Sequence, residues 1–399
     1  MRTLLAVVTG KLLRTALRLV RRGGGSALPG LVASRIDPKL LKRALSSCPA
    51  GLVVVSGSAG KSSTTYQLVK LLENHGLRVF TNPSTANIRQ GLFAAVLKES
   101  NLRGEIDYDI AVLEWDEGHG AALAEELSPR LAVLTNVLSD QLDRFVDPEE
   151  VVAKLAKIAA ESETVIANAD DKNLTQFLHN RPQVFGFGLS EGIDNRPQYA
   201  LNFGYHPEIE QQVFVTGGSP FRVGFHDFEA EVPVDSPSLA LNYAAALLAA
   251  SKLVSLDHET VREQFIATSG VFARNEMTKI FGRDVNLRLV QNPTSFQLNL
   301  DELSGNESPL MLMAGRDIHD PSWLWTVDFS KLKVVNVVGG FNAYELALRL
   351  TVAGVDVGEV HPEISDATAA FFKLAGERPT ILFSADAMRR FRRHVKVAK

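Results

Sequence analysis

The segment S-G-S-A-G-K-S-S at residues 56–63 holds the residue types that bind phosphate groups, and it directly follows an apolar run at residues 52–55. A glycine-rich turn between a buried strand and the start of a helix presents backbone N–H groups to a polyphosphate. In such a turn Lys61 would neutralise the phosphates, and the hydroxyl of Ser62 would reach a Mg²⁺ ion. The segment therefore predicts binding of ATP.

The spacing within this segment differs from that of the commonest phosphate-binding loop, which has a glycine where Val55 stands here. The match is to the shorter pattern G-x-x-G-K-[ST]-[ST], with Gly57, Gly60 and Ser63 in the corresponding places. Apolar residues at helical spacing over residues 63–73 predict the helix that such a loop requires. The alternative is a structural turn with an exposed lysine, since a glycine–lysine string alone is a weak signal.

Acidic and amide side chains follow three of the predicted strands. They belong to the string L-E-W-D-E, which begins at Glu114, to T-N at residues 135–136 and to N-A-D-D at residues 168–171. Ligands of parallel sheets bind at the carboxyl ends of strands, and Mg²⁺ prefers oxygen ligands. We therefore expect Glu114 to hold Mg²⁺ together with Ser62. The alternative for any one of these positions is that the side chain caps the following helix.

The composition is that of a globular protein with more than one core. The chain has 399 residues, of which 45% are hydrophobic and 22% charged, and this length favours two domains. A net charge of -4 and a pI near 6.2 give no reason to expect nucleic-acid binding. The only cysteine, Cys48, excludes an intrachain disulfide framework and a multi-cysteine zinc site. We expect Cys48 to be a core residue and the protein to be cytoplasmic.

The N-terminal segment departs from this charge balance, because residues 1–30 hold arginine and lysine but no acid. Helical spacing places Lys11, Arg14, Arg18 and Arg22 on one face. The charges interrupt the apolar runs, so the segment is too short to cross a bilayer, and no cleavage site of a signal peptide follows it. Two expectations remain open: an amphipathic helix at the inner face of the membrane, or a helix docked on the protein's own core with its arginines in water.

Strand and helix patterns alternate along most of the chain, which predicts an α/β fold: a parallel-sheet ATP-binding domain followed by a smaller Rossmann-like α/β domain. We expect an N-terminal helix and linker at residues 1–48, the central domain at 49–280 with a β-rich insertion at about 188–236, and the C-terminal domain at 281–399. The predicted strands are residues 52–55, 77–80, 108–113, 131–137, 164–167, 184–187, 285–290, 310–313, 334–338 and 380–383. The predicted helices are residues 37–46, 63–73, 90–98, a helix from 147, and residues 238–254, 258–267, 343–353 and 366–375.

Several separate motifs, in the same order, resemble the Mur ligases, the ATP-dependent ligases of peptidoglycan precursor assembly. The loop at residues 56–63 resembles the ATP loop of that family. The run from Thr81 to Asn87 and the strings L-E-W-D-E, T-N-V-L-S-D-Q-L-D-R and N-A-D-D are similar to those of its MurT-type members, the ligase subunits of lipid II isoglutaminyl synthases. So are G-K-L-L-R and I-D-P-K-L-L-K near the N-terminus, and Q-N-P and S-W-L-W in the C-terminal half. The resemblance covers nearly the whole chain and implies a Mur ligase-like central domain.

The resemblance implies a two-step reaction that depends on ATP and Mg²⁺. The D-glutamate carboxylate of the lipid II stem peptide would be activated as an acyl phosphate, and ammonia would then displace phosphate to give D-isoglutamine. The ammonia would come from glutamine, hydrolysed by a separate GatD-type glutaminase subunit. The sequence supports this division, because a glutaminase needs a cysteine activated by histidine, and Cys48 lacks the signature of a nucleophile turn. A noncatalytic or regulatory nucleotide-binding partner and a stand-alone Mur or folylpolyglutamate-type ligase remain as alternatives.

Carried over residue by residue, the resemblance implies roles for individual side chains near the nucleotide. Lys61 would bind the β- and γ-phosphates, and Ser62 and Glu114 would be the neighbours of magnesium. Asn242, in the string L-N-Y-A-A-A, would contact the adenine side of ATP. Arg274, in F-A-R-N-E, would approach the phosphates or the ribose.

The resemblance also implies an aspartate that completes the Cys–His pair of the glutaminase across the subunit contact. Asp320 matches this aspartate best by position, and Asp317 is the second choice. The chain departs from the family at this point, because Pro321 follows Asp320 directly. It departs again in the insertion: relatives carry a cysteine zinc ribbon there, whereas residues 188–236 contain no cysteine. We therefore expect no structural zinc.

Overall fold

The computed structural model describes most of the chain as two compact units, one up to residue 267 and one from residue 276. The described residues are 1–20, 28–82, 88–138, 148–191, 193, 209–218, 220–225, 227–234, 236–267, 276–290, 293–301, 303, 305, 307–318 and 321–397. Each unit is a sheet of mainly parallel strands with helices packed on it. The predicted fold class is therefore confirmed.

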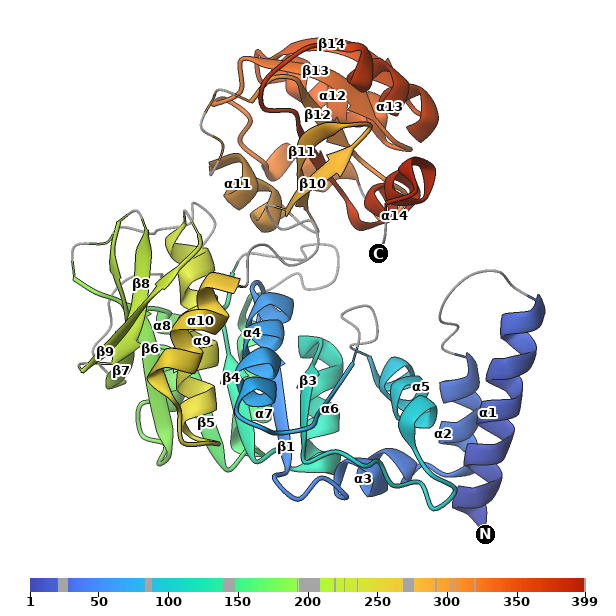
Figure 1. The fold of residues 1–399 in the computed structure, drawn as a ribbon, viewed down its shortest axis with the longest axis vertical. Helices are drawn as coiled ribbons and strands as arrows, with labels where there is room; N and C mark the ends of the chain where they lie inside the picture. Colours follow the sequence, from blue (N-terminus) through green and yellow to red (C-terminus); the bar gives the residue numbers. More distant parts are fainter. Residues whose placement is uncertain are drawn as a thin grey trace. The chain divides into compact units, whose positions relative to one another are not determined.

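The sheet of the first unit has the strand order β2-β3-β1-β4-β5-β6-β7-β8-β9 (Figure 1). Its strands are β1 (Leu52–Ser56), β2 (Val79–Thr81), β3 (Ile110–Glu114), β4 (Leu131–Leu134), β5 (Thr164–Asn168), β6 (Val184–Leu189), β7 (Gln211–Gly217), β8 (Phe221–Phe225) and β9 (Phe228–Val232). Strands β1 to β7 run parallel to one another, whereas β8 and β9 pair antiparallel with their neighbours. From β1 the chain passes to the edge strand β2, returns to β3 beside β1, and then crosses to β4 on the other side of β1. The loop after β1 therefore lies at the topological switch point, where ligands of such folds bind.

Helices cover both faces of this sheet. Helices α4 (Lys61–Asn74), α9 (Pro237–Ser251) and α10 (His258–Ala267) pack together on one face, and α6 (Glu117–Leu127), α7 (Pro148–Ala160) and α8 (Lys172–Leu178) pack in sequence on β1, β4 and β5. All five residues of β1 are buried, as expected for a central parallel strand covered on both sides. Helix α9 is buried over residues 240–250, which explains why its sequence is apolar all round.

A layer of helices at the end of this unit comes from the N-terminal segment and α5. It consists of α1 (Arg2–Val20), α2 (Leu28–Ile36), α3 (Leu40–Leu45) and α5 (Arg89–Glu99). Helix α2, which contains Pro29 and Gly30, was not predicted. Proline is tolerated in the first turn of a helix, and a Cβ at Gly30 would lie 2.3 Å from the carbonyl oxygen of Gln90. Gly30 thus allows α2 to approach α5 closely.

The second unit has a sheet of strand order β10-β11-β15-β12-β13-β14. Its strands are β10 (Glu276–Ile280), β11 (Arg283–Leu289), β12 (Leu310–Met313), β13 (Val334–Gly339), β14 (Asp356–His361) and β15 (Thr380–Phe383). Its helices are α11 (Pro293–Asp301), the 3₁₀ helix η2 (Pro321–Thr326), α12 (Ala343–Val352), α13 (Ile364–Lys373) and α14 (Ala385–Val395). Only the β10–β11 hairpin is antiparallel. The carboxyl ends of β12, β13 and β15 therefore meet at one edge.

Candidate nucleotide site

The loop after β1 is shaped by two glycines that no other residue could replace without strain. Gly57 has φ 129° and Gly60 has φ 85°, both in the region that favours glycine. A Cβ at Gly57 would lie 2.3 Å from Oγ1 of Thr135, and one at Gly60 would lie 2.1 Å from Oδ1 of Asn242. The loop is thus packed between the end of β4 and helix α9, and it leads directly into α4, which begins at Lys61.

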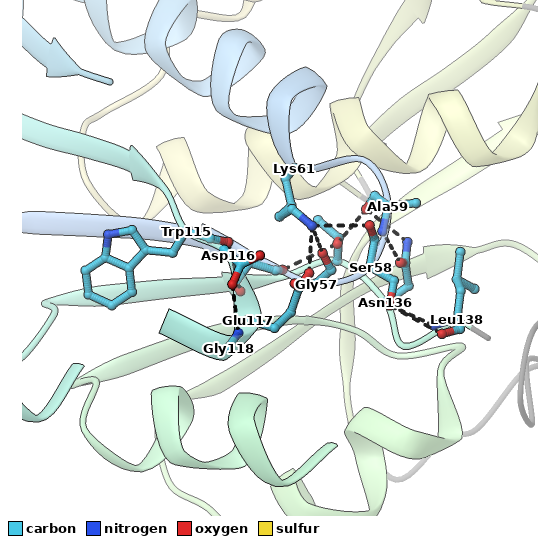
Figure 2. A network of polar contacts seen from close by, with 12 residues as sticks. Gly57, Ser58, Ala59, Lys61, Trp115, Asp116, Glu117, Gly118, Asn136 and Leu138 are labelled. Carbon is cyan, nitrogen blue, oxygen red and sulfur yellow. Dashed lines mark hydrogen bonds and ion pairs between the residues drawn. The ribbon is translucent and has the colours of Figure 1, made fainter. Parts of the chain in front are cut away.

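Lys61 lies in the centre of a network of polar contacts (Figure 2). Its ammonium donates to the carbonyl oxygens of Gly57 and Ser58 and to Oε1 of Glu117, which lies 2.6 Å away. The side chains of this ion pair are 12% and 2% exposed, so water screens the pair little. The second oxygen of Glu117, Oε2, is buried and has no hydrogen-bond partner among the described residues. The loop therefore has a shielded positive charge beside an incompletely satisfied carboxylate.

Two residues at the end of β4 hold the loop in shape. The side-chain oxygen of Asn136 accepts a hydrogen bond from the N–H of Ala59 at 2.8 Å, and its carbonyl accepts one from Ser58 at 2.9 Å. Thr135 donates from Oγ1 to the carbonyl of Ala59 at 2.7 Å. The sequence singled out residues 135–136 only as polar residues at the end of a strand. In the described structure they support the phosphate loop itself.

Glu114 and Glu117 lie on the neighbouring strand β3 and at the start of α6. Glu114 is the last residue of β3 and pairs in register with Val55 at the end of β1, which puts it beside the loop. It is buried, and its backbone exchanges two hydrogen bonds with the side chain of Asn82. Asp116 caps α6 by accepting from the N–H groups of Gly118 and His119, so the capping alternative applies to this residue.

Glu117 is the residue that sequence reasoning missed. It belongs to the same string as Glu114, but its approach to Lys61 depends on where α6 begins, and Asp116 sets that point. A buried lysine in the loop needs a carboxylate partner, because an isolated buried charge is costly. The need for a carboxylate partner of Lys61 among the acids after β3 was therefore the sequence signal that pointed to Glu117.

Ser62, Ser63 and Asn242 lie at the start of α4 or against it. Ser62 and Ser63 are in the first turn, where backbone N–H groups and the helix dipole favour an anion. Asn242 is buried in α9, and its Oδ1 accepts a hydrogen bond from Oγ1 of Thr64 at 3.3 Å. The described contacts of Asn242 are with the loop and the start of α4. Arg274 lies outside the described residues.

The acids after β5 have structural partners. Asp170 accepts hydrogen bonds from the N–H of Leu189 and from Gln211, and Asp171 accepts from Val137 and from Asn173, where it caps α8. Burial raises the pKa of Asp170 to about 6 and that of Asp171 to about 7, although the hydrogen bonds act in the opposite direction. These side chains connect β5 to its neighbours, and the capping alternative holds for Asp171.

The described residues contain no group of three or more histidine, cysteine, aspartate or glutamate side chains placed to hold a metal. Mg²⁺ does not need such a cage, because it keeps several waters and is bound by one or two carboxylates plus substrate phosphates. The hydroxyl of Ser62, the carboxylate of Glu114 and the unsatisfied Oε2 of Glu117 are oxygen donors of the kind that this ion prefers. The residues present therefore fit a magnesium–nucleotide complex. His206 and His226, the histidines of the insertion, lie outside the described residues.

In the second unit, Asp317 follows β12 and is held by the residues that follow β15. It accepts hydrogen bonds from Oγ of Ser384 at 2.6 Å and from the N–H of Asp386 at 3.0 Å. The carboxylate of Asp386 in turn accepts from the N–H of Arg316. Asp317 thus joins the loop after β12 to the start of α14. Asp320 lies outside the described residues.

Sequence profiles of two known families match the chain. The profile of the Mur ligase middle domain matches residues 55–250, and that of the MurT ligase C-terminal domain matches residues 289–388. Two similar curated proteins are MurT subunits of lipid II isoglutaminyl synthase (glutamine-hydrolyzing). The one from Staphylococcus aureus (strain COL) is 25% identical over 90% of this chain and 89% of its own length. The one from Streptococcus pneumoniae (strain ATCC BAA-255 / R6) is 25% identical over 84% of each chain.

Solved structures show the same fold at lower sequence identity. The MurF ligase from Thermotoga maritima, in complex with ADP, superposes with a TM-score of 0.68 at 18% identity, over 91% of this chain and 84% of that one. A pseudomurein peptide ligase type C from Methanothermus fervidus superposes with a TM-score of 0.65 at 15% identity, over 87% and 79% of the two chains.

Proposed function

The chain belongs to the Mur ligase family, and on that premise we propose that it is the ATP-dependent ligase subunit of a glutamine amidotransferase that converts the D-glutamate of the lipid II stem peptide to D-isoglutamine. The observation that carries the proposal is the phosphate loop at the switch point of the first sheet, with Lys61 shielded in it. The MurT profile over the second unit distinguishes this assignment from that of a stand-alone Mur ligase.

The loop residues supply what phosphoryl transfer requires, namely positioning and compensation of charge. The N–H groups at the start of α4 would receive the phosphates. Lys61 would turn from Glu117 to the β- and γ-phosphates, so its ammonium would stay paired with an anion. Ser62 and Glu114 would hold Mg²⁺, which when bound neutralises charge on the transferring phosphoryl group.

In the first chemical step, a carboxylate oxygen of the acceptor attacks the γ-phosphorus, the bond to the bridging oxygen breaks, and ADP leaves. In the second, ammonia attacks the acyl carbon, phosphate leaves with the carboxylate oxygen, and a proton is lost from nitrogen. Lys61 stabilises charge on the phosphoryl group in the first step. The buried contacts of Thr135 and Asn136 keep the loop rigid throughout.

The source of ammonia would be a separate GatD-type glutaminase. Cys48 is 3% exposed, and burial together with the charge of Asp109 raises the pKa of its thiol to about 11. A glutaminase nucleophile needs an accessible thiolate, so Cys48 is unsuited to that task. This supports a role for a second subunit, and the similar proteins are themselves named as subunits.

The second unit offers a surface for such a partner. Five of its exposed apolar residues lie on α12 or close to it, and we call them the α12 surface: Trp325, Phe341, Tyr344, Leu348 and Val352. The last three recur at helical spacing, and Arg316, beside Asp317, stacks on Phe341 at 5.0 Å. A contiguous exposed patch of this kind is typical of a protein interface. It connects with the loop that carries Asp317 and leads to Asp320, the aspartate proposed to complete the partner's Cys–His pair.

The proposed reaction is tested by measuring ATP hydrolysis and lipid II amidation with the acceptor, glutamine and the glutaminase omitted in turn. Amidation should require ATP and acceptor in every case, and free ammonium should replace glutamine and glutaminase together. A nucleotide-binding regulator would give no amidation with ammonium. A stand-alone ligase would use an amino acid in place of ammonia.

A further inference from the structure

Helix α1 packs on the first unit through a face of small residues. Ala6 and Val7 are fully buried, and a Cβ at Gly10 would lie 2.7 Å from Cδ1 of Leu97 in α5. The helix lies beside α2 at the edge of this unit (Figure 1). These close contacts fix the rotation of α1 about its own axis, so the opposite face points to solvent.

That opposite face is apolar. Leu5, Val8 and Leu12 follow one another at helical spacing and are 57%, 38% and 66% exposed, and Met1 and Leu4 extend the same surface. We call these five residues the α1 stripe. The sequence left open whether α1 would dock on the protein or meet a membrane with its basic face. In the structure it docks through alanine, valine and glycine and presents leucines outward.

Basic residues border the α1 stripe. Lys11 lies on one margin and Arg2 on the other, and no acid precedes Asp37 in the sequence. Lys11 donates to the carbonyl of Ser100, so its position on this margin is fixed. An apolar stripe with basic margins is the arrangement by which an amphipathic helix lies in the interface of an anionic bilayer. None of the helices in the described part of the chain combines the length and apolar character that crossing a bilayer requires.

We propose that the α1 stripe inserts into the surface of an anionic lipid bilayer, with α1 lying parallel to it. This location rests on the proposed function in one respect: a lipid-linked acceptor would be met at such a surface. A second copy of the chain fits the stripe less well. A two-fold contact through α1 would bring Arg2 and Lys11 of both copies close together, and α1 itself has no acid to offset their charge.

The test is co-sedimentation of the full chain with phosphatidylcholine vesicles, with and without phosphatidylglycerol. The chain should bind the anionic vesicles, and added salt should weaken binding. Leu5→Asp combined with Leu12→Asp should lower the partition coefficient at least about tenfold, because both charges would have to enter the interface. The matched control is Ile266→Asp combined with Met277→Asp, two apolar residues on other elements that are 67% and 63% exposed, and it should bind as the unaltered chain does.

Three results would overturn the proposal. They are failure of the unaltered chain to bind anionic vesicles, an equal loss in the control, and a concentration-dependent dimer that Leu5→Asp with Leu12→Asp abolishes. ATP-dependent amidation of detergent-solubilised acceptor should be unchanged in the α1 variant, because α1 is remote in sequence from the phosphate loop and makes no described contact with it. Failure of the proposed function would instead remove amidation from every variant while vesicle binding persists.

Discussion

The two sheets of this protein gather polar residues at the same kind of edge, yet the two edges are built differently. After β1, two glycines in left-handed conformation form a cradle, and a buried lysine–glutamate pair sets its charge. After β12, the carboxylate of Asp317 is tied to Ser384 and to the start of α14, and exposed apolar residues lie nearby. The first edge is suited to a polyphosphate and the second to a protein partner. The ends of strands therefore mark both sites, whereas glycine conformation and buried charge decide what each site can bind.

The largest expected effect comes from removing the charge in the cradle. Lys61→Ala should lower kcat/KM for amidation at least about a thousandfold, because no other described side chain can take its place at the phosphates. It should also lower the free energy of unfolding by about 3 kcal/mol, since Glu117 would remain buried without its partner. Amidation assays and chemical denaturation measure the two effects.

The control for this variant is Lys61→Ala combined with Glu117→Gln, which removes the unpaired charge. It should recover much of the stability and none of the activity. Normal ATP-dependent activity in Lys61→Ala would place the nucleotide site elsewhere.

The second largest effect is expected at the sheet edge of the second unit and should leave the nucleotide site of the first unit unaffected. Asp320→Asn should lower glutamine hydrolysis by the complex about a hundredfold or more, as loss of an orienting aspartate does in hydrolytic triads. Amidation driven by free ammonium should persist, because the phosphate loop belongs to the other unit. Asp317→Asn is the control: its amide oxygen can still accept from the N–H of Asp386 and its NH2 can donate to Oγ of Ser384, so glutaminase activity should be kept.

If Asp317→Asn alone impairs glutamine hydrolysis, Asp317 and not Asp320 serves the partner. If neither variant does, this chain contributes no aspartate to the glutaminase. Neither result would bear on the nucleotide site of the first unit.

A smaller effect is expected at the α12 surface. Leu348→Asp should weaken binding of the glutaminase about tenfold or more, because a charge would have to be buried in an apolar contact. Met277→Asp is the matched control, since Met277 belongs to the same unit and is similarly exposed. Isothermal titration calorimetry measures both affinities. Equal binding by the two variants would remove α12 from the interface.

The smallest effect is on stability and concerns Asp171. Burial raises its pKa from 3.8 to about 7, so the folded state holds a proton that the unfolded state releases. Asp171 therefore contributes stability that is fully present below about pH 4 and is lost as the pH rises through about 7. Asp171→Asn should remove that dependence, which we expect to be on the order of 1–3 kcal/mol. Denaturation curves of both proteins between these pH values test the sign, and a parallel course would contradict it.

Much of the architecture was predictable because its signals are local. Strands β12 and β15 were predicted at the residues where they lie, since each is a short apolar run, and the helix after the loop follows from its apolar spacing. Strand β14 was missed because D-V-G-E-V-H lies at a sheet edge and is mostly exposed or half-buried, so it has no apolar face to reveal it. Helix α14 was missed although its buried residues Ala387, Phe391 and Val395 follow one another at helical spacing. Strand β14, by contrast, depends on tertiary contacts that sequence spacing does not report.

The site shows the same division. The glycines, Lys61 and Ser62 were read from spacing alone, because a phosphate loop is a local structure. The ion pair with Glu117 and the support from Asn136 join segments far apart in the sequence, and they depend on how β3 and β4 flank β1. The outward face of α1 depends on which side packs against α2 and α5, and an amphipathic pattern with two apolar sides does not decide that.

The most direct test of the account is transfer of a heavy-oxygen label in the chain without its partner. The acceptor would carry the label in its D-glutamate carboxylate, and ATP and ammonium would be supplied. An acyl phosphate intermediate predicts amidated acceptor together with inorganic phosphate that contains the label, because the carboxylate oxygen leaves with the phosphoryl group. Amidation with unlabelled phosphate would contradict the acyl phosphate, and absence of amidation would contradict the assignment of the ligase chemistry to this chain.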